Sequence, residues 1–184
     1  MNMYLDFIFQ SSERLRELIR GLMQYSRIGR ERHLLEMNIP NLIDEIKKDL
    51  QFSIEESSAI IHYNHLPVVH AYPTEMRLLF QNLISNAIKF RNKNTQTIIE
   101  INCSESTNNW AFTVEDNGIG VEEKNLEKIF IIFKRLHNRD EYEGTGIGLA
   151  HCKKIIDLHG GKIWMESTKG IGSKVVFTIP KIQA

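Results

Sequence analysis

The sequence has few cysteines, no excess of charge of either sign and no long apolar run. Of its 184 residues, two are cysteines, Cys103 and Cys152, and they form no CxxC motif. A disulfide framework or a structural zinc site therefore lacks its ligand set. We expect a protein of a reducing compartment.

Charge and hydropathy argue against two further classes of protein, those that bind nucleic acid and those that span a membrane. Lys and Arg total 23 and Asp and Glu total 23, so no global positive field is available to hold nucleic acid. No apolar run approaches the roughly 18 residues needed to cross a bilayer. Residues 1–17 also lack the cleavage pattern of a signal peptide. We expect a cytoplasmic chain that binds no nucleic acid, with any membrane anchor of the full-length protein in a segment outside this sequence.

What is present fits a folded domain. Hydrophobic residues make up 42% and charged residues 25%, which are ordinary globular values. The length suits one compact domain with an appended element.

Residues 4 to about 30 have the pattern of one long amphipathic helix. Leu15, Leu18, Ile19 and Leu22 follow the i, i+3, i+4, i+7 spacing of a buried stripe. Periodicity does not name the covering surface, so the body of the domain and another chain are equal alternatives.

The rest of the chain alternates between strand and helix patterns, which predicts a two-layer α/β sandwich. A mixed sheet should be covered by helices on one face, after the one long helix. The predicted strands are 34–39, 59–63, 68–71, 97–103, 110–115, 162–167 and 174–180, and the predicted helices are 40–54, a segment capped by Thr74 with an apolar face at 76–88, 121–130 and 147–159.

Asn82, Asn86 and Lys89 form the first polar cluster. Their i, i+4, i+7 spacing stacks them on one helix face, beside the apolar face. Two amides and an ammonium group in a line can hold a hydrated divalent cation and a phosphate chain. A solvated helix face is the alternative.

The second cluster, residues 114–120, ends a strand with Asp116, Gly118 and Gly120. Asn117-Gly118 would suit a hairpin turn, but the residues that follow lack strand alternation. A buried Asp beside glycines that permit close backbone approach suits an exocyclic amine such as that of adenine.

The third cluster opens a helix, where unpaired backbone N–H groups and the helix dipole favour phosphate. It is not GxGxxG, because a leucine stands at the third glycine position, and no GxxxxGK[ST] motif exists. A flexible loop is the alternative. The cluster consists of Gly144, Thr145, Gly146, Ile147, Gly148 and Leu149.

Together and in this order, the clusters resemble the ATP-binding domain of sensor histidine kinases, over about residues 34–180. Segments 133–144 and 159–167 are most similar to the phytochrome-like subgroup. The resemblance implies the histidine-kinase ATPase (Bergerat) type of α/β sandwich. The family's N, G1, F, G2 and last glycine boxes are matched by 81–90, 116–120, 129–133, 144–148 and 170–173.

Residues 12–27 are similar to the second helix of the family's dimerisation and histidine-phosphotransfer hairpin. None of the seven histidines is followed by Glu or Asp, as the family's acceptor histidine is. We expect 1–32 to be the second helix of a truncated hairpin and 33–184 to be the catalytic domain. Tyr72 stands where the family commonly has Asp, for which we expect a structural consequence.

The resemblance implies a role for each matching residue. Asp116 would bind the adenine amine of ATP, in a pocket shaped by Gly118 and Gly120. Asn86 would hold Mg²⁺. Asn82 and Lys89 would contact phosphate, and Arg135 would neutralise charge on the transferred group. The lid and its phosphate donors would be Gly144, Thr145, Gly146, Ile147, Gly148 and Leu149.

The implied activity is transfer of the ATP γ-phosphoryl group to a histidine on a phosphotransfer helix of its own or a partner subunit. A response regulator receiver domain would receive it next, and the full-length protein would be a homodimer. One alternative is ATP hydrolysis, but related hydrolases have Glu at the position of Asn82, and an amide cannot take a proton from water. The other is a non-catalytic nucleotide-binding module, against which the retained Asp116, Asn86 and Lys89 argue.

Overall fold

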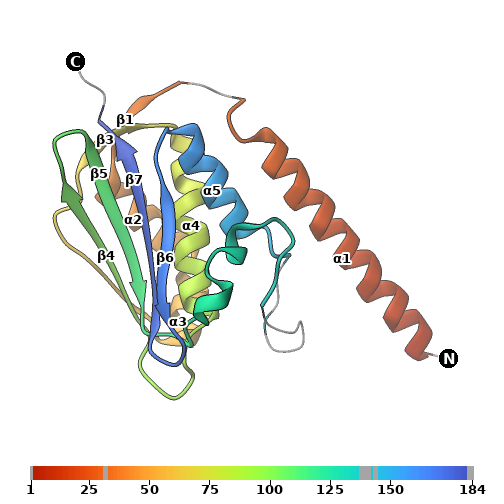
Figure 1. Cartoon of the computed structure of the whole chain (residues 1–184). Helices are drawn as coiled ribbons and strands as arrows, with labels where there is room; N and C mark the ends of the chain where they lie inside the picture. Colours follow the sequence, from red (N-terminus) through yellow and green to blue (C-terminus); the bar gives the residue numbers. More distant parts are fainter. Residues whose placement is uncertain (1, 31–32, 137–141, 143–144, 182–184) are drawn as a thin grey trace.

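The computed structural model describes residues 2–30, 33–136, 142 and 145–181. A long helix, α1 (Asn2–Arg27), precedes a two-layer body in which helices cover one face of a sheet (Figure 1). The N-terminal half of α1 extends away from the sheet, and its C-terminal half approaches α5 (Gly148–Leu158) (Figure 1). None of the described helices is long and apolar enough to cross a membrane.

The main sheet has five strands in the order β2-β4-β5-β7-β6. The β2–β4 pair is parallel and the other pairs are antiparallel. A separate antiparallel pair joins β1 to β3. The strands are β1 (Leu35–Asn38), β2 (Ile60–Tyr63), β3 (Val68–Ala71), β4 (Ile98–Glu105), β5 (Asn109–Asp116), β6 (Ile163–Thr168) and β7 (Gly172–Pro180).

Four helices belong to the body: α2 (Ile39–Asp49), α3 (Gln51–Ser57), α4 (Pro73–Lys89) and α5. The core lies between α4 and the sheet. Phe80 of α4 meets Phe112 and Phe177 edge-on, with ring centroids 5.9 and 5.6 Å away. All three rings are fully buried, so α4 is fixed on the centre of the sheet.

Three details of the predicted helices are wrong. Residues 40–54 form two helices, because Leu50 has φ −96° and ψ 10° and ends α2 before α3 begins. Thr74 is not a cap, since α4 begins at Pro73, whose missing N–H and fixed φ suit a first turn. Residues 121–130 contain only two 3₁₀ turns, η1 (Glu123–Asn125) and η2 (Lys128–Phe130).

The predicted apolar stripe of α1 is not buried in this chain. Leu15, Ile19 and Leu22 are 59%, 59% and 50% exposed. The helix instead meets the body through Gly21, which is buried, and Tyr25, which is half-buried. The helix thus packs on the body of the domain, which is one of the two alternatives, but through residues other than the predicted stripe.

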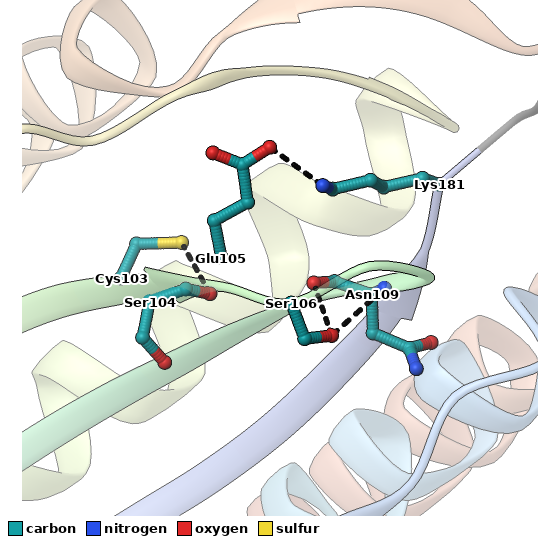
Figure 2. A network of polar contacts seen from close by, with 6 residues as sticks. All are labelled: Cys103, Ser104, Glu105, Ser106, Asn109 and Lys181. Atoms are coloured by element: carbon teal, nitrogen blue, oxygen red, sulfur yellow. Dashed lines mark hydrogen bonds and ion pairs between the residues drawn. The ribbon is translucent and has the colours of Figure 1, made fainter.

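The turn between β4 and β5 is tied to the end of β7 (Figure 2). Lys181 forms an ion pair with Glu105 at 2.5 Å, and its backbone N–H donates to the carbonyl of Asn108. Ser106 Oγ donates to the carbonyl of Asn109 at 3.0 Å. These contacts lie at the end of β5 opposite Asp116, so they hold the sheet without touching the cavity described below.

Candidate functional site

A cavity of about 490 Å³ opens between α4, the start of α5 and the ends of the central strands. It brings the three polar clusters of the sequence together. Two predicted residues, Gly118 and Ile147, do not line it, and Gly144 lies outside the described residues. The predicted residues that line it are Asn82, Asn86, Lys89, Asp116, Gly120, Arg135, Thr145, Gly146, Gly148 and Leu149.

Asp116 is the acceptor at one end of the cavity. It is the last residue of β5, and its Oδ1 accepts a hydrogen bond of 2.8 Å from the Gly118 N–H. Burial raises the pKa of Asp116 to about 6, although the N–H groups of Gly118 and Ser173 favour the ionised form. A half-buried carboxylate of this kind can accept from a ligand N–H group.

Two glycines are required by the close approach of the chain around Asp116. A Cβ on Gly118 would collide with the Phe90 carbonyl and lie 2.7 Å from Asp116 Oδ1. Gly120 has φ +63°, and its Cβ would collide with the Thr168 carbonyl. Gly118 therefore lies behind the wall that carries Asp116, without lining the cavity itself.

The polar face of α4 forms a second wall. Within the described residues, Asn82 Nδ2 is buried and has no hydrogen-bond partner. Leaving such a donor unmet costs about 1–3 kcal/mol, so an acceptor that reached it would stabilise this wall. The Lys89 ammonium group lies 4.6 Å from the Phe90 ring centroid, beside the same cavity.

The start of α5 forms a third wall of the cavity. Ile147 is its N-cap, and no side chain of the described residues caps the helix there. A Cβ on Gly148 would lie only 3.1 Å from Asn82 Oδ1, so glycine lets the backbone N–H groups approach the α4 face. Gly146 has φ +74°, which turns the chain into this helix.

Two cationic residues complete this wall. Lys134 and Arg135 both line the cavity, and Arg135 Nη2 donates to the Tyr142 carbonyl at 2.6 Å. The Tyr142 ring lies 5.0 Å from that of Phe90, which closes one side.

Sequence reasoning missed Glu17, Tyr142, Met165 and Ser173, all of which line the cavity. Ser173 ends the glycine box at 170–173 but was given no role, and the other three lie outside the glycine and amide clusters. Glu17 reaches the cavity from α1, a helix distant in sequence, so no local spacing indicates it. Glu17 can be recognised as a cavity residue only from the packing of α1 on α5, which the fold shows and the sequence does not.

The two ends have complementary chemistry. The end of the cavity that holds Asp116 is surrounded by the apolar side chains of Val114, Ile119, Met165 and Val175. The opposite end holds cationic side chains and the backbone N–H groups at the start of α5. Such a cavity suits a planar apolar ring that carries an N–H donor and is joined to an anionic chain.

Known proteins show the same organisation in sequence. Residues 71–183 match the family described as histidine kinase-, DNA gyrase B-, and HSP90-like ATPase. Cyanobacterial phytochrome A of Nostoc sp. is 41% identical over 180 residues, or 97% of this chain and 23% of that protein. Phytochrome-like protein Cph1 of Synechocystis sp. is 40% identical over 178 residues, or 96% and 24%. The chain thus spans about a quarter of the length of these relatives.

Solved structures agree with the fold. The catalytic domain of histidine kinase ThkA superposes with a TM-score of 0.69 at 30% identity, covering 82% of this chain and 99% of that one. ThkA in complex with response regulator protein TrrA gives a TM-score of 0.71 at 28% identity, covering 97% and 51%. The predicted α/β sandwich and the resemblance to phytochrome-like histidine kinases are confirmed. This chain belongs to the family of histidine kinase-, DNA gyrase B- and HSP90-like ATPases.

Proposed function

We propose that this chain is the ATP-binding catalytic domain of a two-component sensor histidine kinase. It transfers the γ-phosphoryl group of ATP to a histidine on another segment, for relay to a response regulator receiver domain. The observation that carries the proposal is the convergence of Asp116, the amide and ammonium face of α4, and the start of α5 on one cavity. In this proposal 1–32 is the second helix of a phosphotransfer hairpin, 33–184 is the catalytic domain, and the full-length protein is a cytoplasmic-facing homodimer.

Asp116 selects adenine. The ionised carboxylate accepts from the exocyclic amine, while Val114, Ile119 and Met165 contact the faces and edges of the ring. Gly118 and Gly120 keep the backbone close enough for this fit, since neither position has room for a Cβ.

The phosphate chain lies along α4 toward α5. The N–H groups at the start of α5 and the Asn82 Nδ2 donor face phosphate oxygens, and Lys89 and Arg135 balance their charge. Phosphoryl transfer depends mainly on positioning and on stabilising charge in the transition state. These residues provide both.

The donor set fits Mg²⁺ that arrives with the nucleotide. The described residues contain no cluster of three or more His, Cys, Asp or Glu side chains able to hold a metal. Asn86 offers one amide oxygen beside the phosphate end, and Mg²⁺ commonly keeps phosphate and water oxygens as its other ligands. When bound, the ion would neutralise charge on the phosphates.

The acceptor histidine comes from elsewhere. No histidine of this chain is followed by an acidic residue. His151, on α5, is buried, and its Nε2 is 3.2 Å from the Gly21 carbonyl oxygen. A ring held this way cannot meet a γ-phosphate in line. Hydrolysis is disfavoured because the amide of Asn82 cannot act as a general base toward water.

The test is incubation of the chain with γ-labelled ATP and Mg²⁺, with and without a separately produced phosphotransfer hairpin. Acid-labile label should appear on the hairpin and not on one whose acceptor histidine is replaced by alanine. Asn86→Ala in the chain should abolish it. Strong label on the isolated chain would contradict the proposal. Absence of label on the hairpin at high concentration would also contradict it, with phosphate release then indicating a hydrolase and nucleotide binding alone indicating a binding module.

A further inference from the structure

One stripe of α1 packs against one stripe of α5. The Gly21 carbonyl oxygen can only accept, so His151 donates to it from Nε2 at 3.2 Å. Lys154 Nζ donates to the Tyr25 carbonyl at 2.6 Å and lies 4.3 Å from the Tyr25 ring centroid. A Cβ on Gly29 would lie 3.2 Å from Leu158 Cδ1. Gly21 on α1 and Gly29 just after its end, eight residues apart, thus let this segment approach α5 closely.

The contacts show that the two helices run in the same direction. Gly21 packs on Ile147 at the start of α5, and Gly29 packs on Leu158 at its end. Glu17 lies one helical turn before Gly21, so it projects beyond the N-terminus of α5. It lines the cavity there, on the side where phosphate is expected.

Within the described residues the Glu17 carboxylate has no ion-pair partner, although Lys134 and Arg135 line the same cavity. Its side chain is exposed, and no ion pair or hydrogen bond reaches it from the part of the chain that the structure describes. Glu13, one turn earlier, differs: it pairs with Arg16 at 3.0 Å and does not line the cavity.

We propose that Glu17 is a further residue of the nucleotide site. While α1 is packed on α5, the Glu17 carboxylate repels the phosphate groups of a bound nucleotide. This inference rests on the proposed function, because the anion it opposes is the phosphate chain of ATP. The Glu17 carboxylate and the phosphates are both attracted to the N-terminus of α5 and to the nearby cations, so they compete for the same positive potential. Nucleotide binding and α1 packing therefore oppose each other.

The opposition is reciprocal. A packed α1 lowers the affinity for ATP, and bound ATP lowers the occupancy of the packed position of α1 by the same factor. Coulombic repulsion at the high effective dielectric of an open cavity gives roughly a three- to tenfold effect for a triphosphate. The effect should be smaller for a diphosphate and absent for adenosine.

The experiment is calorimetric titration with the Mg²⁺ complex of the ATP analogue AMPPNP, with ADP and with adenosine. Glu17→Gln should tighten AMPPNP binding three- to tenfold, tighten ADP binding less and leave adenosine unchanged. Glu13→Gln removes the same charge from the same helix away from the cavity, and should change none of the three affinities.

A second variant tests the role of α1 packing. Gly21→Leu places a side chain against Ile147 while favouring the helix, so it should separate α1 from α5. It should tighten AMPPNP binding as Glu17→Gln does, and the double variant should bind no more tightly than either single one. A thermal melt of Gly21→Leu checks its folding, and Glu17→Gln alone decides the result if that variant does not fold.

Unchanged or weaker AMPPNP binding in Glu17→Gln would overturn the inference, as would equal tightening for adenosine. Failure of the unsubstituted chain to bind AMPPNP would instead overturn the proposed function. The two failures are therefore distinguishable.

Discussion

The backbone N–H of Tyr72 donates a hydrogen bond of 3.1 Å to Nε2 of His159. Nε2 is therefore the unprotonated nitrogen, and Nδ1 donates to the Ile155 carbonyl at 2.7 Å. Burial lowers the pKa of His159, although the Ile155 carbonyl and the charge of Glu75 favour the protonated form. The neutral ring joins the start of α4 to the end of α5. The Tyr72 ring also packs edge-on against that of His159, with ring centroids 4.9 Å apart.

This relationship predicts acid destabilisation. The pKa of His159 is lower in the folded chain than the value of about 6.5 in the unfolded chain. Its contribution to the free energy of unfolding is therefore fully present above about pH 6.5 and is lost as the pH falls below that value. His151 acts in the same direction. Asp116, with its raised pKa, acts in the opposite one. In urea unfolding at pH 7.5 and 5.5, His159→Gln should lose less stability on acidification than the unsubstituted chain. The exposed His33→Gln is the control, and an equal loss in His159→Gln would contradict the assignment.

The aromatic core gives a second prediction. Phe80→Ala removes a fully buried ring that meets Phe112 and Phe177, so the free energy of unfolding should fall by about 3–5 kcal/mol. Phe52→Ala, at a site that is 78% exposed, is the matched control and should leave it within about 0.5 kcal/mol. Similar losses in denaturant melts of both variants would refute this description of the core.

The turn before α5 gives a third prediction. Gly146 has φ +74°, and a Cβ there would lie 2.9 Å from Arg135 Cγ and 3.0 Å from the Lys134 carbonyl. Gly146→Ala should weaken AMPPNP binding and spare adenosine, because the distortion falls at the phosphate end. Gly170→Ala imposes similar backbone strain at φ +83°, where no described atom lies within 4 Å of the added Cβ. It should lower the melting temperature without changing either affinity.

The titration of Asp116 gives a fourth prediction. An adenine N–H donor favours the ionised carboxylate, so its pKa in the complex falls below the free value of about 6. Adenosine affinity should therefore be highest above pH 6 and fall as pH drops through that value. Adenosine is the suitable probe because it carries no phosphate that titrates in the same range. Constant affinity between pH 7.5 and 5 would contradict the predicted ionisation.

The sequence predicts the strands and the site clusters better than the helix contacts. The apolar face of α4 packs on the core between the helix and the sheet. The spacing of its apolar residues therefore predicts both the helix and the face on which Asn82, Asn86 and Lys89 lie. On α1 the same kind of period misleads, since the helix packs through Gly21 and Tyr25 rather than through its largest apolar residues. Leu50 likewise ends α2 through its backbone angles, which no propensity shows.

The cavity could be predicted only in part for the same reason. Motif residues carry their chemistry in their type and spacing, and the three clusters come together as expected. Glu17 and Met165 enter through tertiary packing alone, and Ile147 turns away from the cavity toward Gly21.

The role of Asp116 as the adenine acceptor is tested most directly by calorimetric titration of Asp116→Asn with the Mg²⁺ complex of AMPPNP. The change places an amide donor against the adenine amine, and an unmet buried partner costs about 1–3 kcal/mol, or roughly five- to 150-fold in affinity. Glu115→Gln, next along β5 and paired with Lys174 at 2.9 Å, removes the same charge outside the cavity and should bind as the unsubstituted chain does. Affinity in Asp116→Asn equal to that of the Glu115 control would contradict the adenine site.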